Sequence, residues 1–125
     1  MCTDELIHRD LSEAIIGAAM TVHNALRPGL REKTYERALV KELTKRSVRT
    51  DRQKSFDVLY DGEVIDTMIP DLIVADAVIV DTKCVTAFDD THIAQMIGYL
   101  TITELRLGLL INFKHSRLQW KRIVN

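Results

Sequence analysis

The sequence predicts a single α/β or α+β domain in which a mixed central β-sheet is flanked by helices. The 125 residues suffice for one ordinary domain but not for two hydrophobic cores, and residues 1–9 are expected to form a loose lead-in. Hydrophobic residues make up 46% of the chain and charged residues 28%, which is typical of a folded globule. The predicted order is helix, helix, three or four strands, helix and two strands, and this order favours a mixed sheet.

Two amphipathic helices are expected in the first half of the chain. The first spans Leu11–Leu26, where apolar side chains recur on one helical face. Asp10 is its expected N-cap, and Glu13 three residues later would close a capping box. A Pro-Gly pair ends this helix, because proline cannot continue the backbone ladder and glycine accepts a left-handed turn. The second helix spans Arg31–Arg46 and carries one apolar stripe.

The pattern changes to that of strands from Val48 onward. Apolar residues alternate with others over Phe56–Tyr60, and the chain returns over Val64–Ile69. Between these runs, Asp61 and Gly62 form a strong two-residue hairpin signal. These residues therefore predict an antiparallel β-hairpin.

Two short apolar strands, a third helix and two final strands complete the predicted order. An N-cap at Asp90 is expected to begin the helix. Its predicted buried stripe consists of Ile93, Met96, Ile97 and Leu100. The five elements are expected at Asp71–Val74, Val78–Lys83, Thr91–Thr103, Leu107–Phe113 and Leu118–Val124.

Composition excludes several functional classes. The formal net charge of -1 produces no global field that would draw the protein onto nucleic acid. Two cysteines, Cys2 and Cys84, are too few for a disulfide framework, a zinc site or an iron–sulfur site, so Cys84 is expected to be a small buried side chain. The first residues do not resemble a signal peptide, and no apolar run approaches the ~20 residues that cross a bilayer. We therefore expect a cytoplasmic protein without a membrane partner.

Three polar side chains are predicted to converge between the two short strands. If the Ala75–Ala77 segment is a tight turn, the strands pair antiparallel and Asp71 lies opposite Asp81. Asp81 and Lys83 are two residues apart on one strand, so their side chains project from the same face. Two carboxylates and an ammonium group would then meet at the end of a hairpin.

This group of side chains suits metal-assisted phosphodiester hydrolysis. Paired carboxylates repel each other unless a cation binds, and oxygen ligands of this kind suit Mg²⁺ or Mn²⁺. Lys83 can neutralise charge on a phosphate or orient the attacking water. A structural interpretation is the alternative, with Asp71 as a turn residue and Asp81 and Lys83 as an exposed ion pair.

Longer motifs support the functional interpretation. The Pro-Asp and Asp-Thr-Lys elements of residues 70–83 resemble the signature of the PD-(D/E)xK nuclease superfamily. Gly29, Glu32 and Tyr35 match the motif that names the GxxExxY protein family, a branch of that superfamily. The resemblance covers roughly Asp10–Asn125, and it implies a restriction-endonuclease-like fold.

The resemblance also implies roles for the second helix. Glu32 would reach the metal site as a further carboxylate, and the alternative is a solvated glutamate favoured by the helix dipole. Tyr35 shares a helix face with Glu32 and is either a substrate contact or a core aromatic. Asp81 stands where this family usually has glutamate, and Arg27 stands where a glycine is common. Because neither change removes a ligand type, we interpret the site as intact.

The third helix contributes candidate substrate contacts. Gln95 and Tyr99 resemble the QxxxY element of RecB-like exonucleases. Gln95 could hydrogen-bond a phosphate or a base, and Tyr99 could stack on a base; the alternative is the polar margin of an amphipathic helix. His23 and His92 are accessory candidates, with structural roles as the alternative.

Basic residues cluster between Lys41 and Lys54, where they could contact a phosphate backbone. The alternative is a helix end and an edge strand that are simply solvated, since edge strands often carry lysine to prevent unwanted pairing.

Together these features predict a Mg²⁺- or Mn²⁺-dependent nuclease that acts on nucleic acid, with DNA favoured over RNA. The first alternative is an inactive nuclease-fold module that binds nucleic acid or a protein partner. The second is a hydrolase of phosphorylated small molecules, and a homodimer is a further hypothesis. The predicted catalytic residues are Asp71, Asp81, Lys83 and Glu32, of which the three acids would bind metal, and the predicted substrate contacts are Gln95, Tyr99 and Tyr35.

Overall fold

A five-stranded mixed sheet forms the centre of the protein in the computed structural model, which describes residues 7–125. The strand order is β1-β4-β5-β6-β7; β5 and β6 are parallel, and the other neighbours are antiparallel. The expected mixed sheet is thus confirmed, while Cys2 and most of the expected lead-in lie outside the described residues. The strands are β1 (Thr50–Arg52), β4 (Leu72–Val74), β5 (Val78–Lys83), β6 (Leu107–Asn112) and β7 (Gln119–Val124).

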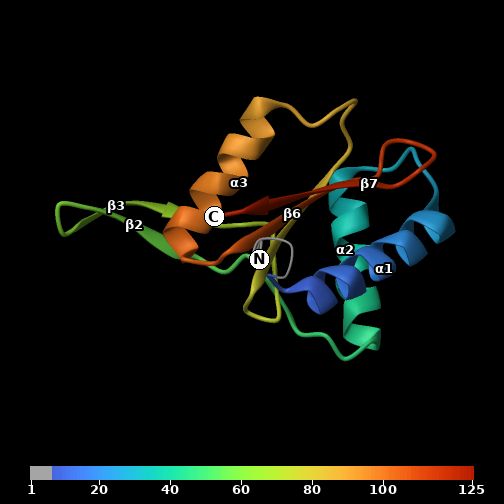
Figure 1. Cartoon of the computed structure of the whole chain (residues 1–125), viewed down its shortest axis with the longest axis horizontal. Coiled ribbons are helices and arrows are strands. Elements are labelled where there is room, and N and C mark those ends of the chain that lie inside the picture. The colour runs from blue at the N-terminus through green and yellow to red at the C-terminus, as the bar shows by residue number, and fades with distance from the viewer. Residues whose placement is uncertain (1–6) are drawn as a thin grey trace.

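Helices cover both faces of this sheet (Figure 1). They are α1 (Arg9–Leu26), α2 (Glu32–Lys45) and α3 (Asp90–Thr103). Val78 and Val80 of β5 pack with α1 and α2, whereas Ile79 packs with α3. Because side chains alternate along a strand, Asp81 and Lys83 continue the face that α3 covers. No helix of the described residues is both long and apolar enough to span a membrane.

The start of α1 differs from the prediction. The helix begins earlier than expected, at Arg9, so Asp10 lies inside its first turn instead of capping it. No side chain caps this end, and Glu13 pairs with Arg9 at 3.4 Å instead of closing a capping box. Arg122 supports the earlier start, because its guanidinium donates to the carbonyl of Ile7, which packs on the core.

The start of α3 also differs from the prediction. Asp89, rather than Asp90, is the N-cap. The Asp89 carboxylate accepts the His92 amide at 3.0 Å, and His92 Nδ1 accepts the Asp89 amide at 3.1 Å, so the two residues form a capping box. The predicted stripe is confirmed at Met96, which is fully buried, but wrong at Ile97, which is 42% exposed. As a single helix packed on a sheet, α3 buries a face that is narrower than the predicted four-residue stripe.

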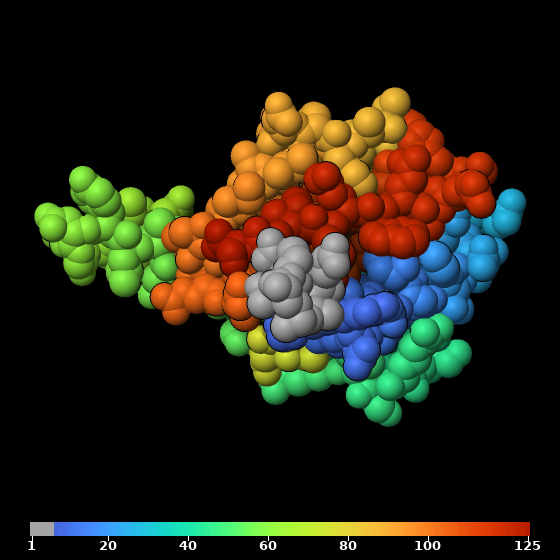
Figure 2. Space-filling model, viewed as in Figure 1, coloured from blue at the N-terminus to red at the C-terminus, as the bar shows by residue number. Residues whose placement is uncertain are grey.

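The predicted hairpin forms, but it stands apart from the central sheet. Strands β2 (Phe56–Tyr60) and β3 (Glu63–Met68) make a two-stranded sheet of their own. Asp61 and Gly62 both have positive φ, as a two-residue hairpin loop requires. This arm, residues 56–68, projects from the body of the protein (Figures 1 and 2). Its exposed apolar side chains include Leu59, Tyr60, Val64 and Ile65.

The close approach of α3 to β6 requires a glycine at position 108. A Cβ atom built there would overlap the side chain of Met96. We therefore expect Gly108→Ala to lower the free energy of unfolding by about 1–3 kcal/mol, the usual cost of overpacking a core. Urea denaturation measures this change.

Gly98→Ala is the matched control for this prediction. No atom lies within 4 Å of a Cβ built at Gly98 in α3, so this substitution should leave stability unchanged or raise it slightly. Equal losses of stability in the two variants would contradict this explanation of the packing.

Candidate active site

Asp71 and Asp81 lie side by side because β4 and β5 form a tight hairpin. The connecting loop consists of the three residues 75–77, and Ala75 and Asp76 in it have positive φ, as tight hairpin turns often require. The register pairs Leu72 with Val80, so the next opposed positions along the two chains are those of Asp71 and Asp81. This arrangement agrees with the geometry that the sequence predicts for the two carboxylates.

The carboxylate of Asp81 is almost wholly buried, and one of its oxygens forms an ion pair with Lys83. Its Oδ2 lies 3.3 Å from Nζ of Lys83, and its side chain is 5% exposed. Its Oδ1 has no hydrogen-bond partner among the described residues. Burial raises the pKa of Asp81 to about 8, with the Asp71 carboxyl adding to this rise and Lys83 opposing it. An ionised Asp81 therefore needs further positive charge beside it.

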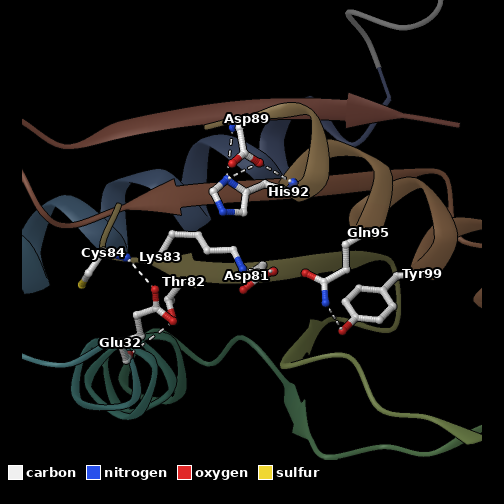
Figure 3. Close-up of polar contacts among 9 residues, drawn as sticks. All are labelled: Glu32, Asp81, Thr82, Lys83, Cys84, Asp89, His92, Gln95 and Tyr99. Atoms are coloured by element: carbon white, nitrogen blue, oxygen red, sulfur yellow. Dashed lines mark hydrogen bonds and ion pairs between the residues drawn. The ribbon is translucent and has the colours of Figure 1, made fainter. Parts of the chain in front are cut away.

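A buried asparagine, which the sequence analysis missed, holds the backbone after Lys83. Asn112 lies opposite Lys83 in the β5–β6 ladder and is fully buried. Its side chain donates to the Val85 carbonyl at 2.7 Å and accepts the amides of Val85 and Lys114. These bonds fix the loop that leaves β5, where Lys83 runs alongside Asp81 (Figure 3). The available sequence signal is a lone asparagine at the end of an apolar strand.

Glu32 lies beside the site, but its carboxylate binds the backbone. It is the first residue of α2, and its Oε2 accepts the Cys84 amide at 2.9 Å. Its own carbonyl faces the Thr82 hydroxyl at 3.4 Å, on the face of β5 opposite to Asp81 (Figure 3). Glu32 and Asp71 nevertheless line one pocket of about 380 Å³. The structure therefore brings Glu32 to the edge of the site and not into direct contact with Asp81.

Glu36 is a third acidic residue of this pocket, and the sequence analysis did not single it out. Its side chain is 3% exposed and lies 3.4 Å from Lys33 and 3.5 Å from Arg52. The four-residue spacing from Glu32 was the available signal, because it places both acids on one face of α2.

Gln95 and Tyr99 of α3 lie on the Asp81 side of the sheet. The Gln95 amide donates to the Tyr99 hydroxyl at 3.2 Å, and the Gln95 side chain reaches toward Asp81 (Figure 3). Burial raises the pKa of Tyr99, and the charges of Asp71 and Asp81 add to the rise while Lys83 opposes it. The structure thus brings both residues of the predicted substrate-binding pair next to the carboxylates.

Tyr35 and two histidines have structural roles in the described chain. Tyr35 is fully buried and stacks on Phe113 with a centroid distance of 4.6 Å. The structure therefore favours the core alternative over the predicted substrate contact. His92 belongs to the capping box of α3, and Nε2 of His23 lies 2.8 Å from the His115 carbonyl.

The carboxylate pair fits a hard divalent cation. Among residues 7–125, no group of three or more His, Cys, Asp and Glu side chains is arranged to hold a metal. However, the unpartnered Oδ1 of Asp81 is buried beside a second carboxylate, so two oxygen ligands are available in one place. Mg²⁺ and Mn²⁺ need few protein ligands, because they keep waters and bind phosphate oxygens.

Comparison with known proteins gives a family and a shared fold. The sequence model of the PD-(D/E)XK nuclease superfamily matches residues 9–123. The protein SSO0001, known from a crystal structure, is similar with a TM-score of 0.53 and 12% sequence identity, over 100% of this chain and 78% of that chain. This similarity shows a shared fold alone. No curated protein matches the sequence.

The raised pKa of Asp81 predicts a pH-dependent stability in the presence of a chelator. The folded state favours protonated Asp81, so stability present below the ordinary pKa of 3.8 is lost as the pH rises through about 8. Asp81→Asn keeps the neutral form at every pH. We expect the variant to melt higher than the wild type at alkaline pH, by at least about 4 °C, and to lose this advantage near pH 4.

Thermal unfolding followed by circular dichroism across this pH range measures the effect. Asp57→Asn, on the exposed arm, is the control and should melt in parallel with the wild type at every pH. A constant offset between Asp81→Asn and the wild type would contradict the assignment.

Proposed function

The chain belongs to the PD-(D/E)XK nuclease superfamily, and on this premise we propose that it is a Mg²⁺- or Mn²⁺-dependent nuclease that cleaves DNA in preference to RNA. Nucleases of this superfamily generally use divalent metal ions, and the mixed sheet flanked by helices is consistent with a restriction-endonuclease-like fold. The observation that carries the proposal is the buried, unpartnered Oδ1 of Asp81, beside Asp71 and next to Lys83.

Each side chain of the site has a role in phosphodiester hydrolysis. Asp71 and Asp81 would hold the cation, and Glu32 would complete or support the ligand shell. When bound, the ion would neutralise negative charge on the phosphate and help to ionise the attacking water. Lys83, kept in place by Asp81, stabilises charge that develops on the phosphate or positions the water. The Gln95–Tyr99 pair of α3 orients the nucleic-acid strand.

We also propose membership of the GxxExxY family, because its three motif residues shape the start of α2 beside the site. Gly29 has a φ of +117°, which favours glycine. Glu32 accepts the Cys84 amide directly after Lys83. The Tyr35 hydroxyl donates to the Arg27 carbonyl at 2.6 Å, and this bond holds the α1–α2 loop against α2. A cytoplasmic location and a homodimer belong to the same proposal.

Substitutions in the carboxylate–lysine group test the nuclease proposal. With Mn²⁺ present, we expect Asp81→Asn and Lys83→Gln each to slow cleavage of labelled DNA by at least about 100-fold, since each removes a charge from the reacting centre. Gel-based cleavage of single- and double-stranded DNA and RNA provides the measurement.

Lys54→Gln is the control for cleavage, because Lys54 is exposed and outside the site. If the wild type and both site variants cut equally, a contaminating nuclease is responsible and the proposal fails. Cleavage of phosphorylated small molecules without cleavage of any polynucleotide would also contradict it.

An inactive nuclease-fold module is the second candidate, and the position of Glu32 favours it. The Glu32 carboxylate binds the Cys84 amide, which leaves Asp71 and Asp81 as the two carboxylates that meet. Calorimetric titration with Mn²⁺ separates the candidates. For a nuclease, we expect a heat of binding that Asp71→Asn abolishes, whereas no heat with the wild type favours the inactive module.

A further inference from the structure

The cations between Lys41 and Lys54 are largely paired with carboxylates. Five of the six basic side chains lie within 4.0 Å of an Asp or Glu oxygen. Strand β1, inside this segment, is an edge strand of the central sheet. The structure therefore favours the solvated-edge alternative, because cations already paired gain less from a phosphate. The paired residues are Lys45, Arg46, Arg49, Arg52 and Lys54.

The arm does not suit nucleic acid either. Residues 56–68 include four acidic residues and no basic residue. Like charges repel the phosphate backbone, so this surface would weaken nucleic-acid binding. The arm also projects at the end of the molecule away from the α1–α2 loop and the β6–β7 turn (Figure 1).

A third surface carries exposed cations without carboxylate partners. Arg27 and Arg31 belong to the α1–α2 loop, and Lys114 and Arg117 belong to the β6–β7 turn. All four are exposed, and within residues 7–125 no ion pair holds any of them. The whole segment 113–125 contains no Asp or Glu. We call these four side chains the basic rim.

Polar bonds join the two halves of the basic rim into one surface. Nε2 of His23, at the end of α1, lies 2.8 Å from the His115 carbonyl. Nε2 of His115 lies 2.8 Å from the Thr86 carbonyl in the β5–α3 loop. The same loop is bound to α2 through Cys84 and Glu32. Figure 1 shows the three loops gathered at one end of the molecule.

The basic rim begins at the carboxyl end of β5, the strand that carries Asp81 and Lys83. The Phe113 amide donates to the Lys83 carbonyl at 2.9 Å, so the β6–β7 turn starts directly beside Lys83. Strands β5 and β6 are parallel, and both of their carboxyl ends open toward this surface. In open α/β sheets, ligands commonly bind outside the carboxyl ends of the strands.

We propose that the basic rim binds successive phosphates of a nucleic-acid strand whose scissile phosphate lies at Asp71 and Asp81. This inference rests on the proposed nuclease site for the strand's position, but it assigns the backbone contacts to the rim rather than to residues 41–54. The four cations of the rim, unpaired within residues 7–125, can release counterions from the strand, whereas most cations of residues 41–54 are already paired and the arm is acidic.

Salt-dependent binding tests this assignment. Anisotropy of a fluorescein-labelled single-stranded oligonucleotide is measured in a chelator, so that binding is observed without cleavage. Removing three rim charges in the triple variant Arg31→Gln, Lys114→Gln and Arg117→Gln should flatten the slope of log affinity against log salt by about 2. At low salt, the affinity should fall by at least about ten-fold.

The matched control removes three charges from the segment 41–54, with Lys41→Gln, Lys45→Gln and Lys54→Gln. Its slope should change by less than about 1. A charge-retaining variant, Arg31→Lys with Arg117→Lys, should keep the wild-type slope. An unchanged slope in the rim triple variant, an equal change in the control, or no binding by the wild type at low salt overturns the proposal.

A small diester separates this inference from the proposed function. Hydrolysis of bis(p-nitrophenyl) phosphate with Mn²⁺ requires the carboxylate site but no grip on a strand. If the rim triple variant hydrolyses the diester normally but binds the oligonucleotide weakly, both proposals are supported. If the wild type hydrolyses no diester and no nucleic acid, yet binding still depends on the rim, the nuclease proposal fails and the rim assignment holds.

Discussion

The antiparallel pairing of β4 with β5 places Asp71 and Asp81 together, and the rest of the site depends on this pairing. Both strands are buried: Val78 and Val80 pack on one face of the sheet, and Ile79 packs on the other. Burial of these side chains stabilises the sheet and at the same time removes water from the Asp81 carboxylate, whereas Asp71 is half-buried beside it. The charge of a buried Asp81 must therefore be balanced by a proton, an ammonium group or a metal cation.

The segment that follows Lys83 connects this charge centre to the surface. Glu32 at the start of α2, and Asn112 and His115 at the end of β6 and in the turn after it, each make a hydrogen bond to the backbone between Cys84 and Thr86. The side chains of these three residues therefore form hydrogen bonds with backbone groups of this segment. This arrangement keeps Lys83 beside Asp81 and gathers the loops that carry the basic rim.

Much of the fold follows from local sequence patterns, whereas the ends of the helices do not. Periodicity and turn residues predict the helices, the strands and the Asp61–Gly62 hairpin. The first helix nevertheless starts at Arg9 because Arg122, far away in the sequence, binds the carbonyl of Ile7. The hairpin stands apart from the central sheet, and within residues 7–125 its two strands pair with each other alone, which its local pattern does not predict.

By itself, the sequence determined that Asp71, Asp81 and Lys83 would converge, because a tight turn and the two-residue period of a strand are local properties. Tertiary structure decided the roles of residues whose partners are distant. It buried Tyr35 against Phe113, bound Glu32 to the Cys84 amide and paired most cations between residues 41 and 54. Burial and charge pairing depend on which distant segments contact each other in the folded protein, and a local sequence pattern does not specify those contacts.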